Sequence, residues 1–316
     1  MVERASGGGR RNGAGWTPAR ARTLHVAGGR PTLSHGVWGM TIAGAPQATA
    51  RWSARSLGGE SFVVRSARPA YETLLEYVSR GRGVHWTING VTFHVDPRHR
   101  HQLSPNYDAP VAAFLAKRVR PGDVCINVGA NVGVYVLQFA NWSRPAGRVV
   151  AFEPNPWALA ILRRHVALNR LSDRVDVVPA AVADAAGEGV LHVCGADGMS
   201  RLSAPNPDLE GRTSVLRVPI VTLDDYCEQA VVAPAWLIVD VEGFELSVLA
   251  GARRLLASRG HNLQILVEMH PDSWALTGHT RSSAEELLVE IKRTPIALSC
   301  QRDPLGAHGM VCLEPM

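Results

Sequence analysis

Two apolar, strand-like segments of the chain, residues 236–239 and 263–267, each lead directly into titratable side chains. Carboxylates and imidazoles in such positions can remove the proton from a hydroxyl group as its oxygen attacks, which is general base chemistry. Acids at the carboxyl ends of parallel strands face the crevice where ligands bind. We therefore expect a catalytic site that uses Asp240, Glu242, Glu245 and His270, with Glu268 beside them.

A structural role is the alternative for each of these side chains. An imidazole suits proton transfer near neutral pH, but His270 stands just before Pro271 and could be a structural histidine. Asp240 could line the site without acting as a base, and Glu245 could stabilise a helix N-terminus while it orients the loop. No set of cysteine, histidine or carboxylate residues stands at metal-ligand spacing, so we expect an enzyme that needs no metal.

A glycine-bearing turn near the middle of the chain has the character of a nucleotide site. Residues 124–128 read as a strand, and Gly129-Ala130-Asn131-Val132-Gly133 leads from it into a helix. Such glycines let the backbone approach a ligand closely, and the helix N-terminus offers unpaired N–H groups. The next strand, residues 148–152, ends on Glu153, where a carboxylate can accept hydrogen bonds from two ribose hydroxyls.

The glycine pattern differs from the dinucleotide fingerprint. That fingerprint is Gly-x-Gly-x-x-Gly and holds a pyrophosphate on the helix end, whereas Asn131 takes the place of its second glycine here. A ligand with an adenosine and no phosphate needs the close turn without the phosphate cradle. S-adenosylmethionine is such a ligand.

The elements around these residues alternate between strand and helix. Further strands are expected at 175–179, 187–193 and 215–221, and helices at 109–118 (capped by Asp108), 156–168, 246–257 and 282–293 (capped by Ser282 or Ser283). This alternation predicts an α/β fold with a doubly wound, mostly parallel sheet. The last two strands, 296–300 and 309–313, are separated by eight residues, too few for a crossover helix, and should form a C-terminal antiparallel hairpin. Such a hairpin distinguishes sheets of the class I (Rossmann-like) methyltransferase type from those of dehydrogenases.

The chain divides into three parts by composition and pattern. Residues 1–60 are an Arg/Gly-rich extension that we expect to be disordered; a transit peptide, or a true start at Met40, would also account for its composition. Residues 61–106 hold a short helix (69–80) and a hairpin around Asn89-Gly90, and residues 107–316 form the methyltransferase domain. The polar stretch 196–214 is a candidate lid or substrate-facing insertion.

Charge and cysteine content restrict the possible partners. Residues 1–68 hold ten arginines, no lysine and two acids, whereas the rest of the chain holds 23 basic and 26 acidic residues. This mildly acidic body argues against nucleic-acid binding. The five scattered cysteines indicate reduced thiols in a cytoplasmic protein, and no apolar run is long enough to span a membrane.

Four motifs resemble the FkbM family of S-adenosylmethionine-dependent methyltransferases, over residues from about 107 to 275. They are Asn127-Val128-Gly129-Ala130-Asn131-Val132-Gly133, Phe152-Glu153-Pro154-Asn155-Pro156, Val239-Asp240-Val241-Glu242-Gly243-Phe244-Glu245 and Val267-Glu268-Met269-His270. The resemblance implies O-methylation of a sugar or natural-product hydroxyl, with S-adenosylmethionine as cofactor. It implies a cofactor site made of Asn127, Gly129, Asn131, Gly133, Glu153, Pro154, Asn155, Ala181 and Asp240.

Three positions depart from the family pattern. Asn127 stands where the family usually has Asp, which removes a charge attraction for the amino group of the cofactor. Ile238 stands where a Lys is frequent, and Asp108 follows Tyr107 where relatives have Glu. Asn127 and Ile238 leave open a methyltransferase-like module that binds without catalysis. A nicotinamide-dependent oxidoreductase is the other alternative, and the missing central glycine at Asn131 argues against it.

Deletion of residues 1–60 tests the predicted division of the chain. We expect the melting temperature and the affinity for S-adenosylmethionine to stay nearly unchanged, because the methyltransferase motifs all lie beyond residue 107. A large loss of either quantity would show that the extension is part of the domain.

Overall fold

The computed structural model describes residues 62–195, 198–203, 205 and 213–316. The extension predicted for residues 1–60 lies outside the described residues, as does part of the stretch 196–214 for which a lid was predicted. None of the helices in these described ranges is both long enough and apolar enough to cross a lipid bilayer.

The lead-in consists of a helix and a hairpin. Helix α2 (Phe62–Ser79) begins well before the helix predicted from residue 69. Strands β1 (Val84–Ile88) and β2 (Val91–Val95) pair antiparallel, as predicted. Asn89 and Gly90 have φ of 47° and 81°, so both turn residues adopt the left-handed backbone that this hairpin requires.

A seven-stranded sheet forms the centre of the fold, in the order β12-β13-β11-β10-β3-β4-β5. Strand β13 pairs antiparallel with both β11 and β12, and the pairs from β11 to β5 are parallel. This order and the C-terminal hairpin confirm the class I methyltransferase fold. The strands are β3 (Val124–Val128), β4 (Arg148–Phe152), β5 (Val175–Val178), β10 (Trp236–Val239), β11 (Gln264–Met269), β12 (Arg293–Ala297) and β13 (Gly309–Pro315).

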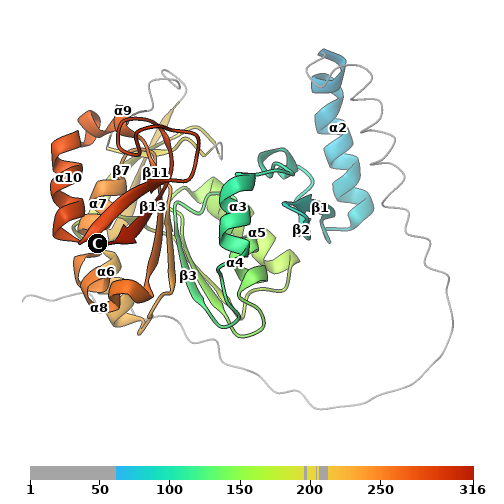
Figure 1. Ribbon diagram of the computed structural model, residues 1–316. Helices are drawn as coiled ribbons and strands as arrows, with labels where there is room; N and C mark the ends of the chain where they lie inside the picture. Colours follow the sequence, from blue (N-terminus) through green and yellow to red (C-terminus); the bar gives the residue numbers. More distant parts are fainter. Residues whose placement is uncertain (1–61, 196–197, 204, 206–212) are drawn as a thin grey trace, which may run out of the picture. The chain divides into compact units, whose positions relative to one another are not determined.

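Helices cover both faces of the sheet (Figure 1). Helices α3 (Ala109–Ala116), α4 (Val134–Trp142) and α5 (Pro156–Leu168) pack on one face, and α6 (Leu223–Gln229), α7 (Glu245–Ala250), α8 (Arg253–Arg259) and α10 (Arg281–Glu290) on the other. The adjacent β10 residues Leu237 and Ile238 are fully buried in opposite layers. Burial on both faces explains why these strands are continuously apolar.

A second sheet of four strands follows β5, in the order β6-β9-β7-β8. It consists of β6 (Ala181–Val182), β7 (Gly187–Val193), β8 (Arg201–Leu202) and β9 (Ser214–Val221). Strands β7 and β9 match the segments predicted from the sequence. The short strand β8 was not predicted, and it lies inside the polar stretch 196–214.

Three details of the helix ends differ from the predictions. The helix predicted at 246–257 is broken into α7 and α8 at Gly251, where the backbone packs so closely on Ala183 that a Cβ would lie 2.1 Å from its carbonyl oxygen. Thr280, rather than Ser282 or Ser283, caps α10. Asp108 takes the N-cap position of α3 but does not cap it, because its carboxylate accepts a hydrogen bond from the Tyr135 hydroxyl at 2.9 Å instead.

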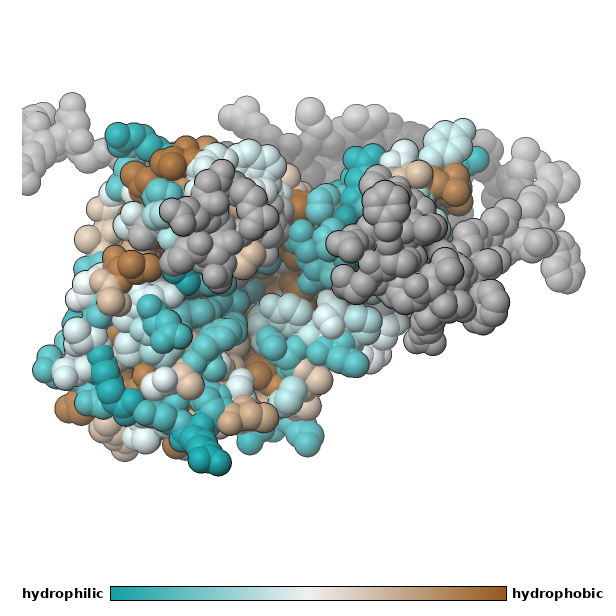
Figure 2. Space-filling view, turned by 90° about the horizontal axis from the view of Figure 1, so that it is seen from above, coloured by the Kyte–Doolittle hydropathy of each residue, from teal (hydrophilic) through white to brown (hydrophobic). Residues whose placement is uncertain are grey.

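The exposed surface of the described part mixes polar and apolar side chains. Figure 2 shows one face on which hydrophobic residues are scattered among hydrophilic ones. Isolated apolar side chains of this kind are normal on a globular protein.

A close contact between two turns leaves no room for a side chain at Gly129. Gly129 follows β3 with φ +79°, and a Cβ at this position would lie 1.7 Å from the carbonyl oxygen of Asp240, which follows β10. The two central turns therefore approach each other more closely than any side chain allows.

We expect Gly129→Ala to lower the free energy of unfolding by more than about 4 kcal/mol or to prevent folding, because the methyl group adds a backbone clash to the strain of positive φ. Gly122→Ala is the matched control, since Gly122 has φ +93° and a Cβ there would meet nothing within 4 Å. That variant should lose about 1–2 kcal/mol, the cost of positive φ alone. Equal losses in denaturant titrations of the two variants would contradict the role of the contact.

Candidate active site

A cleft opens at the carboxyl ends of β3, β4 and β10, and it encloses about 930 Å³ of space when its open mouth is included. All nine residues that the sequence assigned to the cofactor line this cleft: Asn127, Gly129, Asn131, Gly133, Glu153, Pro154, Asn155, Ala181 and Asp240. The fold thus brings together residues spread over more than a hundred positions of the chain.

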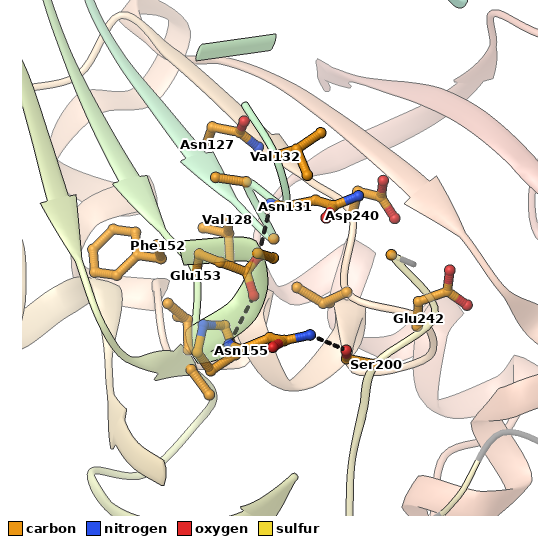
Figure 3. Close-up of a pocket in the computed structure, with 18 of the residues that line it drawn as sticks. Asn127, Val128, Asn131, Val132, Phe152, Glu153, Asn155, Ser200, Asp240 and Glu242 are labelled. Carbon is orange, nitrogen blue, oxygen red and sulfur yellow. Dashed lines mark hydrogen bonds between the residues drawn. The ribbon is translucent and has the colours of Figure 1, made fainter. Parts of the chain in front are cut away.

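The Glu153 carboxylate is fixed by the backbone on both sides of it (Figure 3). Its Oε2 accepts a hydrogen bond from the Asn131 N–H at 2.7 Å, and its Oε1 accepts one from the Asn155 N–H at 2.8 Å. Burial raises the pKa of Glu153 to about 7, although these two N–H groups act in the opposite direction. A carboxylate held so firmly keeps the orientation in which it can accept further hydrogen bonds from a ligand.

Asn155 connects this turn to the insertion that carries β8. Its side-chain Nδ2 donates to the Ser200 hydroxyl at 3.0 Å and to the Gly195 carbonyl at 2.7 Å. Its Oδ1 accepts from the Trp157 N–H at 3.0 Å, so the residue also caps α5 as predicted. Ser200 lines the cleft, but no sequence motif pointed to it, because its contact with Asn155 bridges two distant turns.

Asn127 presents a buried amide to the cleft. The residue is 1% exposed, and its Nδ2 has no hydrogen-bond partner among the described residues. A buried polar group without a partner costs free energy, so a polar ligand atom at this end of the cleft would stabilise it. Ile238, the other departure from the family pattern, is fully buried in the core and does not line the cleft.

Asp240, Glu242 and Glu268 form a group that we call the acid cluster. Asp240 and Glu242 line the cleft on the side opposite Glu153 and Asn155 (Figure 3). Burial, and then the neighbouring Glu268, raise the pKa of Asp240 well above its ordinary value. Burial also raises the pKa of Glu242, against the effect of nearby His270 and Arg201. Carboxylates with raised pKa are stronger bases than ordinary ones.

Glu245 and His270 lie behind the acid cluster and do not line the cleft. Glu245 is fully buried at the first turn of α7. Its Oε1 accepts from the Gly243 N–H and the His270 Nδ1, both at 2.7 Å, and its Oε2 accepts from the Trp274 Nε1 at 3.1 Å. Glu245 therefore orients both the loop after β10 and the His270 ring, whose Nε2 lies 3.8 Å from Glu242 Oε2.

The ionisation of His270 differs from the expectation that its imidazole has an ordinary pKa. Burial alone would lower that pKa, but the hydrogen bond and charge of Glu245, together with Glu242 and Asp240, raise it to about 9. His270 therefore carries a proton at neutral pH in this structure. In that state it is not a general base, and the acid cluster is the group able to accept a proton.

The folded chain brings together two groups of side chains that could hold a metal ion, although the prediction of an enzyme that needs no metal stays a prediction. Two groups of three side chains, Asp240 with Glu242 and His270, and Glu268 with His270 and His308, each bring one ligand atom per residue within 4.8 Å of one another. Spacing along the sequence could not show these groups, because their members come from three separate segments. His308 joins them through the antiparallel register of β11 and β13, which pairs Met269 with Gly309.

The chain is similar to several known methyltransferases. Residues 127–292 match the methyltransferase FkbM domain. The 31-O-demethyl-FK506 methyltransferase FkbM of Streptomyces tacrolimicus is 30% identical, over 60% of this chain and 78% of that protein. Two solved structures are also similar. The methyltransferase FkbM from Methylobacillus flagellatus KT has 16% identity and a TM-score of 0.43, covering 84% of this chain and 58% of that one. The fibrillarin of Aeropyrum pernix in complex with natively bound S-adenosyl-L-methionine has 11% identity and a TM-score of 0.35, and the match covers 64% of this chain and 73% of that one.

The raised pKa of His270 predicts how stability depends on pH in buffer without divalent cations. The folded protein holds this proton more tightly than the unfolded chain, so the stabilisation is complete below pH 6.5 and is lost as pH rises through about 9. The free energy of unfolding should fall over this range by an amount on the order of 2 kcal/mol. His270→Gln should flatten the profile, and His261→Gln, at an exposed histidine, should leave it unchanged. A wild-type profile that stays flat between pH 6.5 and 9 would contradict the assignment.

Proposed function

The chain belongs to the FkbM methyltransferase family, and we propose that it transfers a methyl group from S-adenosylmethionine to a hydroxyl oxygen of a small molecule. The observation that carries this proposal is the fixed carboxylate of Glu153 beside the turn from Gly129 to Gly133. A rigid acid at the end of the second strand is suited to the two hydroxyls of a ribose.

The composition of the cleft wall supports S-adenosylmethionine over a dinucleotide. No lysine or arginine is among the described residues that line the cleft, so a pyrophosphate would find no side-chain countercharge there. Three acids, Glu153, Asp240 and Glu242, do line it, and they suit a ligand with a cationic sulfur. The unpaired Asn127 amide fits the polar methionine end of the same ligand. These observations argue against the nicotinamide-dependent alternative.

When bound, S-adenosylmethionine supplies a methyl group on a positively charged sulfur, which an oxygen can attack in line. Asp240 and Glu242 are placed at the cleft to receive the hydroxyl proton as the acceptor oxygen bonds to the methyl carbon and the carbon–sulfur bond breaks with its electron pair on sulfur. Glu245 and His270 act as positioning residues, because they hold the loop that carries Glu242 without lining the cleft.

The name of one relative and the charge of the site support the acceptor class that we propose. The relative from Streptomyces tacrolimicus is named for 31-O-demethyl-FK506, a natural product that lacks a methyl group on oxygen. A hydroxylated natural product or sugar is accordingly the acceptor that we propose here. The acid cluster disfavours a polyanion such as nucleic acid.

We assign this activity to a domain of residues 107–316. The non-catalytic alternative loses part of its support, since Ile238 lies in the core and away from the cleft.

Calorimetric titration of the full-length protein tests the cofactor assignment. We expect micromolar binding of S-adenosylmethionine and of its demethylated product, and no binding of NADH. Glu153→Ala should lower the affinity for S-adenosylmethionine and for its demethylated product about 100-fold. The reason is that two hydrogen bonds from ribose hydroxyls to a charged carboxylate are lost.

The matched control is Glu188→Ala, which removes an acid with a 73% exposed side chain that pairs with Arg217 at 3.9 Å. It should bind both ligands as the wild type does, and circular dichroism should show that both variants are folded. Unchanged affinity in the Glu153 variant would remove the ribose assignment. Wild-type protein that binds neither ligand would favour the non-catalytic module.

A further inference from the structure

We propose that Asp240, Glu242 and His270 bind a divalent cation at the acceptor end of the cleft, where it would hold and activate the hydroxyl that receives the methyl group. The cation site follows from the geometry of this chain alone. Its role in catalysis rests on the function proposed above.

The three side chains have the spacing of a coordination sphere. Each offers one ligand atom, and these atoms lie within 4.8 Å of one another. Ligands that surround an ion at about 2.0–2.6 Å are separated by no more than about 5 Å. Two of the three, Asp240 and Glu242, line the cleft, so an ion between them would have coordination positions open to a substrate.

The orientation of His270 points to a ligand at its Nε2. Its Nδ1 is fixed by the fully buried Glu245, which is itself held by the Gly243 N–H and the Trp274 Nε1. A carboxylate that fixes one ring nitrogen while the other faces a set of acids is the arrangement found behind metal-ligating histidines. Glu245 is not one of the proposed ligands, so this support is independent of the acids that would contact the ion.

The site also has an excess of negative charge. Among the described residues, the one permanent cation paired with the acid cluster is Arg201, whose Nη2 lies 3.8 Å from Glu242 Oε2. That same Nη2 donates to the Ser273 hydroxyl at 2.7 Å, which divides its interaction between two partners. Three carboxylates that converge on one arginine and one imidazole are stabilised by a bound cation, and binding of the ion to the imidazole nitrogen would release the proton held there.

The second group of candidate ligands is the less suitable one. It shares His270 but replaces the two cleft residues by Glu268 and by His308, whose side chain is 58% exposed. Glu268 Oε1 already pairs with His308 Nε2 at 2.9 Å, and the His270 and His308 rings stack with centroids 4.5 Å apart. Neither Glu268 nor His308 lines the cleft, so we assign the ion to the first group.

The donor set indicates the kind of ion and of acceptor. Two carboxylate oxygens and one imidazole nitrogen suit Mg²⁺ or Mn²⁺, with the remaining positions filled by water or substrate oxygens. A cation in this place lowers the pKa of a bound hydroxyl and orients its oxygen. An acceptor with two neighbouring oxygens could occupy two open positions at once. We therefore expect hydroxyls flanked by a second oxygen to be the preferred substrates.

The site can be tested by titrating full-length protein, first treated with a chelator, with Mn²⁺ alone. Electron paramagnetic resonance measures the binding, because the signal of the free ion is lost when the ion binds. Wild type should bind one equivalent. Glu242→Gln and Asp240→Asn should each weaken binding at least about tenfold, because a charged ligand becomes neutral. His308→Ala and Glu188→Gln should bind as wild type does. Thermal unfolding of each variant shows whether it is folded. If Glu242→Gln does not fold, Asp240→Asn provides the test, and the converse also applies.

Three results would overturn the proposal: no wild-type binding at millimolar Mn²⁺, full binding by both cleft variants, or a loss that follows His308→Ala instead. Calorimetry with S-adenosylmethionine separates this proposal from the cofactor assignment. If the chelated wild type binds S-adenosylmethionine but no Mn²⁺, the cation site fails and the cofactor assignment stands. If the chelated wild type binds Mn²⁺ but no S-adenosylmethionine, the cation site stands and the cofactor assignment fails.

Discussion

The contact of Gly129 with the carbonyl oxygen of Asp240 is the constraint on which the rest of the site depends. Strands β3 and β10 are the neighbours at which the strand order of the sheet changes direction, so the chain leaves their two touching turns toward opposite faces of the sheet and a crevice remains beside them. The turn after β3 donates the Asn131 N–H to the Glu153 carboxylate on one side. The turn after β10 carries Asp240 and Glu242 to the other side. One backbone contact therefore sets the separation between the two chemically different ends of the cleft.

Two buried carboxylates, Glu153 and Glu245, hold these turns in the same way, by accepting hydrogen bonds. A buried charge is costly unless hydrogen bonds compensate it, and each of these carboxylates accepts hydrogen bonds on both of its oxygens. Glu153 connects the turns after β3 and β4, and Glu245 connects the loop after β10 with His270. Among the described residues, the acid cluster is contacted by His308 at Glu268 and by Arg201 at Glu242, and not by a comparable set of backbone donors. This difference separates carboxylates that fix the fold from carboxylates available to substrate or cation.

The sequence predicted the fold, and it predicted nine residues that the fold brings into one cleft, because both depend on local signals. Strand periodicity, the Asn89-Gly90 turn and the glycines around Asn131 act within a few residues, and all three were confirmed by the structure. The break at Gly251 was missed because it arises from packing on Ala183, a distant residue. Ser200 and His308 were missed for the same reason, since each reaches the site through contacts that bridge separate elements. The raised pKa of His270 likewise depends on three acids that only folding brings together.

One wall of the cleft is built partly by residues that precede the glycine turn. Tyr107 lines the cleft, and its carbonyl oxygen accepts a hydrogen bond from Asn89 Nδ2 at 2.7 Å. The same Nδ2 donates to Gln138 Oε1 at 2.9 Å, so the hairpin turn is joined both to the cleft wall and to α4. Tyr107 also packs edge-on against Tyr135, whose hydroxyl donates to Asp108. The lead-in hairpin therefore helps to fix this wall of the cleft through Asn89 and Tyr107.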